Sequence, residues 1–392
     1  MGRYNFDEIV SRENTNALKY ERREAIFGKE DVFPMWVADM EFRTPSFCID
    51  AIKERLEHPI LGYFQFPDSF YDSIIWWMKR RHDWDIQKEW ISFSPGVVPS
   101  ISASILAFSN PGDKVIVQSP VYHPFFFSIL HQDREVLNNP LKVVDGRYEM
   151  DFEDLENKLK TGAKLMLISN PHNPVARAWE PEVLERLGNL CIEYNCILVS
   201  DEIHSDLILP SYKHTPTAAL SKEISMNTIT MMAPSKTFNL AGLATAETII
   251  ENPKIKEKFD RVLADALHLN MGNVFGPIAL EAAYSKEGEE WLEELMVYLD
   301  NNLKAMNDYL KKNHPRIRRY KHESTYLVWL DFSEYGLGHE ALKNKLIFEA
   351  GLGFNDGNIF GDGGDNKMRV NIALAKSQLM DALKRFEVLE RK

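Results

Sequence analysis

The middle of the chain alternates short apolar runs with helix-like segments, and this alternation limits the possible folds more than any other feature. The apolar runs occupy residues 114–118, 164–169, 196–200 and 228–233. Residues 151–161, whose first turn is acidic, and residues 180–195 have the pattern of helices. Strands that are apolar throughout and separated by helices indicate a parallel sheet covered on both faces.

Polar residues follow three of these apolar runs directly. The run at 164–169 is followed by the letters NPHNP and the run at 196–200 by DEIH. The run at 228–233 is followed by PSK. In parallel α/β sheets, ligands bind beyond the carboxyl ends of the strands. We therefore expect Asn173, Asp201 and Lys236 to lie at one edge of one sheet.

The length of 392 residues exceeds what one compact core usually accommodates. The C-terminal pattern also differs from the middle. It predicts a long helix, a strand, a helix, a glycine-rich loop, a strand and a helix, at residues 289–313, 325–330, 339–350, 351–364, 367–374 and 376–390. We expect an α/β protein with a large domain at 48–286, holding a mostly parallel sheet between helices, and a smaller α+β domain formed by 1–47 and 287–392.

Charge and cysteine content narrow the functional class. The net charge of -12 argues against nucleic acid as a partner. Cys48, Cys191 and Cys196 form no C-x-x-C pair, which favours a reducing compartment over a disulfide framework. The N-terminal MGRYNFDEIV lacks the apolar core of a signal peptide, and no stretch has the apolar length of a membrane span. We expect a cytoplasmic protein without a membrane partner.

The segment SKTFNLAGL around Lys236 resembles the lysine motif of the fold-type I pyridoxal 5'-phosphate (PLP) enzymes, the aminotransferase class I/II superfamily. NPHNP and DEIH resemble the other two hallmark segments of that superfamily and stand in the same order. PMWVADM at 34–40 and GVVP at 96–99 resemble its cystathionine β-lyase (MalY/PatB) branch. The resemblance runs from about residue 30 to the end.

The resemblance implies roles for the three strand-end residues. Lys236 would hold PLP as a Schiff base, because a desolvated lysine can act as nucleophile and base. Asp201 would face the pyridine nitrogen and keep it protonated. Asn173 would donate to the phenolic oxygen of the ring. Without the resemblance, these residues could equally be a turn lysine, a helix N-cap aspartate and a turn asparagine.

Further cofactor contacts follow from the same resemblance. His204 would lie near the phenolic oxygen, and Tyr122 would stack on the ring, although a core aromatic has the same pattern. Donors for the phosphate would come from Ser235 and from the turn before a helix expected at 99–109. The residues of that turn are Gly96, Val97 and Val98.

The substrate and the partner subunit complete the implied site. Arg369 would pair with the substrate α-carboxylate, because a guanidinium binds a carboxylate in a bidentate way, and Val37 and Asn173 would also contact the substrate. Tyr63 would reach the phosphate of a neighbouring subunit, which implies a homodimer with a shared site. A loop tyrosine used for packing is the alternative for Tyr63. No metal is expected.

Two departures from the superfamily pattern stand out. Many aminotransferases have an arginine a few positions after the lysine, whereas residues 237–245 contain no basic side chain. This difference favours the lyase branch. Ala176 replaces a glycine found in relatives, so local strain is expected if its φ is positive.

The implied function is a PLP-dependent carbon–sulfur β-lyase, which cleaves cystathionine or cysteine S-conjugates to a thiol, pyruvate and ammonia. Lys236, Asp201 and Tyr122 would be its catalytic residues. An aminotransferase would use the same residues, so the sequence leaves that activity open. A regulatory or binding protein that holds PLP without turnover is a third alternative.

Overall fold

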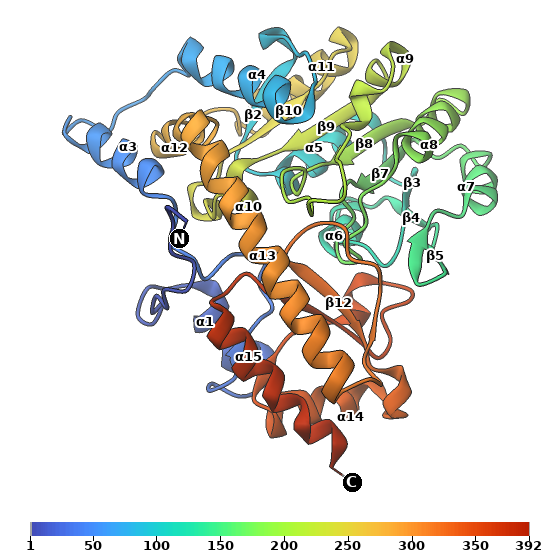
Figure 1. The fold of residues 1–392 in the computed structure, drawn as a ribbon. Coiled ribbons are helices and arrows are strands. Elements are labelled where there is room, and N and C mark those ends of the chain that lie inside the picture. The colour runs from blue at the N-terminus through green and yellow to red at the C-terminus, as the bar shows by residue number, and fades with distance from the viewer. Residues whose placement is uncertain (1, 392) are drawn as a thin grey trace.

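The computed structural model describes residues 2–391. A seven-stranded sheet forms the centre of the larger part of the molecule, with strand order β2-β10-β9-β8-β7-β3-β4 (Figure 1). Its strands are β2 (Ile91–Ser94), β3 (Lys114–Val117), β4 (Glu135–Asn138), β7 (Leu165–Ser169), β8 (Ile197–Asp201), β9 (Thr228–Met232) and β10 (Ala246–Ile249).

The strands from β9 to β4 are parallel to one another, and β10 is antiparallel to both of its neighbours. The register places Ser169 opposite Asp201 and Asp201 opposite Met231. The carboxyl ends of β7, β8 and β9 therefore lie side by side. The α/β fold class with a mostly parallel sheet is confirmed.

Both faces of the sheet are buried, because successive strand residues point to opposite sides. In β3, Val115 and Val117 belong to one apolar cluster, whereas Ile116 belongs to another. The first cluster includes side chains of α5 (Val97–Phe108), α6 (Pro124–Leu130) and α11 (Pro253–Asp260). The second includes side chains of α7 (Phe152–Leu159) and α8 (Pro181–Glu193).

A third cluster connects the large sheet with the smaller part of the molecule. The long helix α13 (Lys286–Asn313) contributes side chains to this cluster and runs from one part to the other (Figure 1). In the larger part the cluster includes α3 (Ser46–Leu56), α4 (Asp68–His82) and α12 (Phe275–Ala283). In the smaller part it includes α14 (His339–Asn344) and α15 (Lys376–Lys384).

The smaller part contains a four-stranded antiparallel sheet with order β11-β12-β15-β14. These strands are β11 (Arg318–Arg319), β12 (Leu327–Asp331), β14 (Asn355–Asp356) and β15 (Lys367–Asn371). The N-terminal region joins this part through α1 (Leu18–Glu21), α2 (Arg23–Phe27) and the parallel pair β1 (Phe33–Pro34) and β13 (Leu352–Gly353). Shorter elements are β5 (Lys142–Val144), β6 (Arg147–Glu149), α9 (Lys222–Ser225) and α10 (Pro234–Thr237).

Three local predictions differ from the structure. Helix α5 begins at Val97 with Gly96 as its N-cap, so Val97 and Val98 lie in its first turn and not before it. The segment 351–364, expected as a loop, contains β13, β14 and a 3₁₀ turn. The helix expected at 339–350 is α-helical only to Asn344 and continues as a π-helical turn. The boundaries proposed for the two domains stay a prediction.

Two further sequence expectations bear on the interior and the surface. All three cysteines are buried and free, which agrees with the expectation that they build no disulfide framework. Ala176 has a φ of 55°, so the strain expected at this alanine is present. Within residues 2–391, no helix combines the length and the apolar character needed to cross a membrane.

Candidate active site

A cavity of about 200 Å³ lies at the carboxyl ends of β7, β8 and β9. Most of the residues singled out in the sequence line it together. They are Gly96, Val97, Val98, Tyr122, Asn173, Asp201, His204, Ser235 and Lys236. Residues separated by up to 140 positions thus share one cavity because the parallel register aligns the strand ends.

Lys236 lies in the short helix α10, which begins two residues after β9. Its Nζ donates a hydrogen bond to the carbonyl oxygen of Ala38 over 2.9 Å. Burial lowers the pKa of Lys236 to about 8, assisted by the positive charge of Arg369 and opposed by Asp39 and Asp201. At this pKa a substantial share of the amine is neutral near physiological pH, as a nucleophile or base requires.

Asp201 is the last residue of β8 and is 4% exposed. Its Oδ1 accepts the backbone N–H of Ile203 over 3.1 Å. Burial raises the pKa of Asp201 to about 7, although this hydrogen bond and Lys236 act in the opposite direction. A buried carboxylate held this way would be stabilised by a cation placed against it, such as a protonated ring nitrogen.

Arg369 approaches the cavity from β15 in the smaller part of the molecule and is 3% exposed. Its Nη1 donates to Asn173 Oδ1 over 3.0 Å, and its Nη2 donates to the carbonyl oxygen of Trp36 and to Asn355 Oδ1. Its Nε has no hydrogen-bond partner among residues 2–391. Burial lowers the pKa of Arg369 to about 10. A free buried donor on a guanidinium suits a carboxylate ligand.

His204 and Tyr122 both line the cavity. His204 is 2% exposed, and its Nδ1 has no hydrogen-bond partner in the described chain. Burial, together with Lys236 and Arg369, places the pKa of His204 well below its usual value, so the ring is neutral. Burial and the charge of Asp201 raise the pKa of Tyr122. Both rings therefore offer neutral polar atoms to a ligand.

The end of the cavity that would suit an anion is built from helix α5. Its first turn presents the backbone N–H groups of Val97 and Val98, which the helix itself does not pair. Ser235 contributes a hydroxyl, and Thr245, which was not identified from the sequence, lines the same cavity. Because residues 237–245 contain no basic side chain, the donors at this end of the cavity are hydroxyl and backbone N–H groups.

The segment 36–40 is held by side chains of the site through its backbone. The carbonyl of Ala38 accepts from both Lys236 and the Tyr326 hydroxyl, the latter over 3.1 Å. Asn371 Nδ2 donates to the carbonyls of Val37 and Asp39, over 2.7 Å and 2.6 Å. The sequence motifs could not predict these contacts, because every residue type has a backbone carbonyl that can accept a hydrogen bond.

A buried ionic group lies behind the lysine. Asp206 Oδ2 accepts from the Thr237 hydroxyl over 3.0 Å, and the Trp77 indole N–H also donates to this carboxylate. His82 Nε2 lies 3.2 Å from Asp206 Oδ1. These residues hold the helical turn that carries Lys236. In the sequence, the sign of this buried group is Asp206, an acidic residue five positions after Asp201.

Three of the expected site residues do not line the cavity themselves. Arg369 is connected to it through its hydrogen bond to Asn173. Val37 lies beside it, with its carbonyl bound by Asn371. Tyr63 is 96% exposed, in the segment between α3 and α4. A role for Tyr63 in the site of a partner subunit stays a prediction.

The aminotransferase class I and II family model matches residues 31–386. The "Cystathionine beta-lyase PatB" of Bacillus subtilis (strain 168) is 42% identical over 384 residues, covering 98% of this chain and 99% of the relative.

Two solved structures are also similar over nearly the whole chain. A PLP-bound protein from Clostridium difficile 630 has a TM-score of 0.96 and 43% identity, covering 98% of this chain and 99% of that one. The PLP-bound C-S lyase from Staphylococcus hominis has a TM-score of 0.92 and 32% identity, covering 99% and 98%.

Proposed function

The chain belongs to the aminotransferase class I and II family, and on that premise we propose that it is a PLP-dependent carbon–sulfur β-lyase acting on cystathionine or cysteine S-conjugates. The observation that carries the proposal is the joint placement of Lys236, Asp201 and Asn173 around one cavity, with Arg369 hydrogen-bonded to Asn173. The similarity to a cystathionine β-lyase and to a C-S lyase over the full length supports the reaction.

The residues of the cavity fit PLP on three independent grounds. The buried carboxylate of Asp201 suits a protonated pyridine nitrogen, and the unpartnered Nδ1 of His204 suits a polar ring substituent. The first turn of α5, with Ser235 and Thr245, suits a phosphate. Lys236 would carry the cofactor, Tyr122 would stack on its ring and Asn173 would bond its phenolic oxygen.

When bound, PLP supplies an electron sink for the pair of electrons left on the α-carbon of an amino acid. Arg369 and Asn173 hold the α-carboxylate of the substrate, which fixes the Cα–H bond relative to Lys236. The amine of Lys236 would take the α-proton, and the Asp201 carboxylate would hold a protonated ring nitrogen. The Cβ–S bond then breaks, and the ammonium of Lys236 can return a proton to the departing thiolate. With one water, the overall products are a thiol, pyruvate and ammonia.

We also propose that the active site is shared in a homodimer. Leu56, Ile60, Leu61 and Tyr63 are all exposed apolar or aromatic side chains near one another in sequence. Such a cluster is typical of a surface that another subunit covers. Tyr63 would then reach the phosphate site of the partner subunit.

The test of the proposed activity is incubation of the PLP-loaded enzyme with cystathionine in the absence of any keto acid. We expect equal amounts of pyruvate and thiol, and less than a thousandth of that rate with Lys236→Ala. A strict requirement for a keto-acid acceptor, with no pyruvate in its absence, would assign the chain to the aminotransferases instead.

A further inference from the structure

A lysine near the N-terminus is buried against the segment 36–41. Lys19 is 1% exposed, although it lies in the four-residue helix α1. Its Nζ lies 2.6 Å from Glu41 Oε1 and 3.2 Å from Asp39 Oδ1, and it donates to the carbonyl oxygen of Asp39 over 3.3 Å. A charged lysine is almost never buried without such partners. Neither the proposed mechanism nor the proposed cofactor site uses this group.

Arg12 completes a group of two cations and two carboxylates. Its Nη2 donates to Asp39 Oδ2 over 2.8 Å and its Nη1 to Glu41 Oε1 over 3.3 Å, while the Tyr20 hydroxyl donates to the other oxygen of Glu41. Although burial acts in the opposite direction, Lys19 and Arg12 lower the pKa of Asp39, so this carboxylate is charged. The two positive and two negative charges balance, which a buried ionic group requires.

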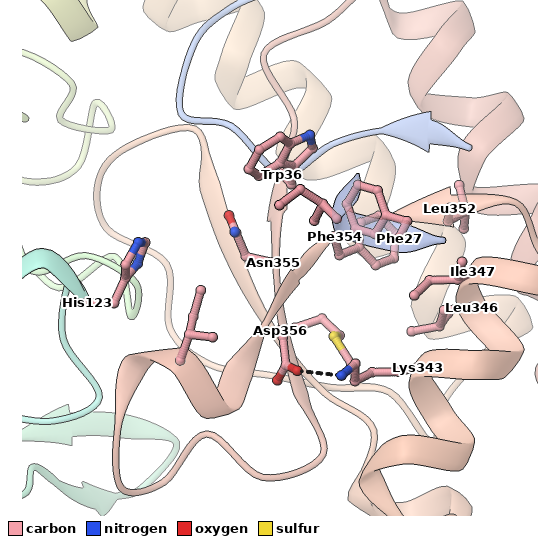
Figure 2. A pocket seen from close by; sticks show the side chains of 13 residues that line it. Phe27, Trp36, His123, Lys343, Leu346, Ile347, Leu352, Phe354, Asn355 and Asp356 are labelled. Carbon is pink, nitrogen blue, oxygen red and sulfur yellow. Dashed lines mark ion pairs between the residues drawn. The ribbon is translucent and has the colours of Figure 1, made fainter. Parts of the chain in front are cut away.

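Further hydrogen bonds hold the segment 36–41 at its two ends. The indole of Trp36 donates to the carbonyl oxygen of Lys19 over 3.0 Å. Figure 2 shows Trp36 beside Phe27 of α2, in the wall of a cavity of about 360 Å³, and the two ring centroids lie 6.0 Å apart. At the other end, Asn239 Nδ2 donates to the carbonyl oxygen of Met40 over 3.0 Å. The N-terminal region therefore holds one end of this segment, and the chain just after the catalytic lysine holds the other.

The same segment contacts the amine of Lys236. The carbonyl oxygen of Ala38 accepts from Nζ of Lys236 over 2.9 Å, and Asp39 is the next residue. Burial lowers the pKa of Lys236 to about 8, whereas the charge of Asp39 raises it. Lys19 and Arg12 place two positive charges against that carboxylate. Because opposite charges cancel, these cations reduce the negative potential that Asp39 creates at the amine.

The other charged and titratable groups that face the Lys236 amine come from separate elements. Arg369 on β15 acts on its pKa in the same direction as burial, and Asp201 at the end of β8 acts against it. None of the groups on these elements forms a hydrogen bond or an ion pair with Lys19 among residues 2–391. Burial raises the pKa values of two tyrosines and lowers that of one histidine, so these three are neutral: Tyr122, Tyr326 and His204.

We propose that Lys19 and Arg12 are positioning residues that act on Lys236. Their charges balance the carboxylate of Asp39, so that the amine stays available as a neutral nucleophile. The same contacts keep the carbonyl of Ala38 in place as the acceptor of that amine. The inference rests on the proposed function only in that Lys236 carries PLP, and it assigns a role to residues 12–20, which precede the first motif of the sequence.

The test measures the rate at which the apoenzyme captures PLP between pH 6 and pH 10, with no substrate present. Lys19→Met removes one cation, so we expect the inflection of the profile to move up by about one pH unit and the rate at pH 7 to fall about tenfold. At pH 10 the amine is mostly neutral in both proteins, so the two rates should agree within about twofold. A role in packing alone would lower the rate equally at every pH.

Compensating charge changes provide the controls. Lys19→Arg keeps the charge and should keep the inflection of the wild type. Lys19→Met combined with Asp39→Asn removes one charge of each sign, so its inflection should return close to that of the wild type. This double variant leaves Arg12 and Glu41 as a balanced pair and no unpaired buried charge to prevent folding. Arg43→Met is the matched control, because Arg43 pairs with Glu8 at the surface, where the two side chains are 66% and 39% exposed, and its profile should not change.

Three results would overturn the proposal. The first is a wild-type inflection in Lys19→Met, and the second is an equal loss of rate at pH 7 and pH 10. The third is an inflection in the double variant as high as in Lys19→Met alone, because the charge of Asp39 would then play no part. If Lys19→Met is insoluble, the double variant is compared with Asp39→Asn and must have the higher inflection of the two.

The measurement is independent of the lyase reaction, because it ends when PLP is captured. If these shifts occur but the PLP-loaded enzyme releases no pyruvate from cystathionine, the proposed reaction fails and the roles of Lys19 and Arg12 stand. If pyruvate is released and the inflections of Lys19→Met and Arg12→Gln both match the wild type, the reaction stands and these roles fail.

Discussion

At the scale of single residues, the site depends on charges placed where water cannot reach them. Burial drives the pKa values of Lys236 and Asp201 toward each other, to about 8 and about 7. Each group therefore titrates close to physiological pH. Such displaced values are typical of functional sites, and here they have a structural cause in the closed strand-end cavity.

The first residue-scale prediction concerns the amine of Lys236. Only the neutral amine can add to an aldehyde, and a pKa of about 8 means that this form dominates above pH 8. We expect the rate at which the apoenzyme captures PLP to rise about tenfold per pH unit below pH 8 and to level off above it. Stopped-flow absorbance between pH 6 and pH 10 measures this rate.

Asp39 provides the control for that profile. Its charge raises the pKa of Lys236, so Asp39→Asn should move the inflection to lower pH. An inflection near the ordinary lysine value of 10.5, in either protein, would contradict the effect of burial.

The second residue-scale prediction concerns Glu247 on β10, which accepts the Tyr284 hydroxyl over 2.6 Å. Burial raises the pKa of Glu247 from 4.5 to about 8. Between these values the folded protein keeps a proton that the unfolded chain has lost, so stability falls as pH rises, by about 1.4 kcal/mol per pH unit. We expect Glu247→Gln to remove this dependence and to raise Tm at pH 8. Thermal unfolding of both proteins from pH 5 to pH 8 measures the difference, and parallel curves would refute it.

At the scale of elements, the site depends on the close fit between α12 and the segment that follows Lys236. A Cβ built on Gly276 would lie 1.9 Å from Thr245 Oγ1 and 2.7 Å from the carbonyl oxygen of Leu243. The helix can approach this segment only because residue 276 has no side chain. The segment in turn contributes Thr245 to the cavity.

We therefore expect Gly276→Ala to displace residues 243–245, to destabilise the protein by about 1–3 kcal/mol and to weaken PLP binding. Chemical denaturation and a titration of the apoenzyme with PLP measure the two effects. Gly242→Ala is the matched control, because no described atom lies within 4 Å of its added methyl group. If both variants had the same stability and the same affinity for PLP, residues 243–245 would accommodate the added methyl group without loss of free energy.

The elements also show what the sequence could predict and what it could not. The strand ends at Asn173, Asp201 and Lys236 were predictable, because apolar runs and the parallel register bring them together. The positive φ of Ala176 was predictable from a glycine pattern in relatives. The hydrogen bond from Lys236 to the Ala38 carbonyl could not be predicted, because residue type does not determine which backbone carbonyl accepts a bond. A cavity of about 360 Å³ in the smaller part could not be predicted, because its walls come from α2, α14, β13, β14 and β15, which are far apart in the sequence.

At the scale of the whole molecule, the two parts of the chain share one apolar core along α13 and share one site. Arg369 belongs to the smaller part and bonds Asn173 of the larger part directly. In the proposed homodimer, the exposed Tyr63 would extend the same arrangement to a second subunit. In this arrangement, each proposed site takes residues from three separate regions of two chains.

A mixing experiment tests the shared site. Lys236→Ala and Tyr63→Ala are each expected to be weakly active or inactive when pure. After the two are unfolded together and refolded, half of the dimers are mixed, and one site in each mixed dimer has both Lys236 and the partner subunit's Tyr63. About a quarter of the wild-type activity should therefore return. Recovery no greater than the sum of the two pure variants would mean that each subunit works alone.

The burial of the three cysteines has a practical consequence for following this chemistry. Cys48, Cys191 and Cys196 are each 0% exposed, and burial raises the pKa of Cys48 to about 12. A thiol in that state has almost no thiolate to exchange with disulfides. The protein should therefore stay free of mixed disulfides with the thiols it releases. An aromatic disulfide reagent added to the reaction should report the released thiol continuously, with the folded enzyme itself contributing no colour.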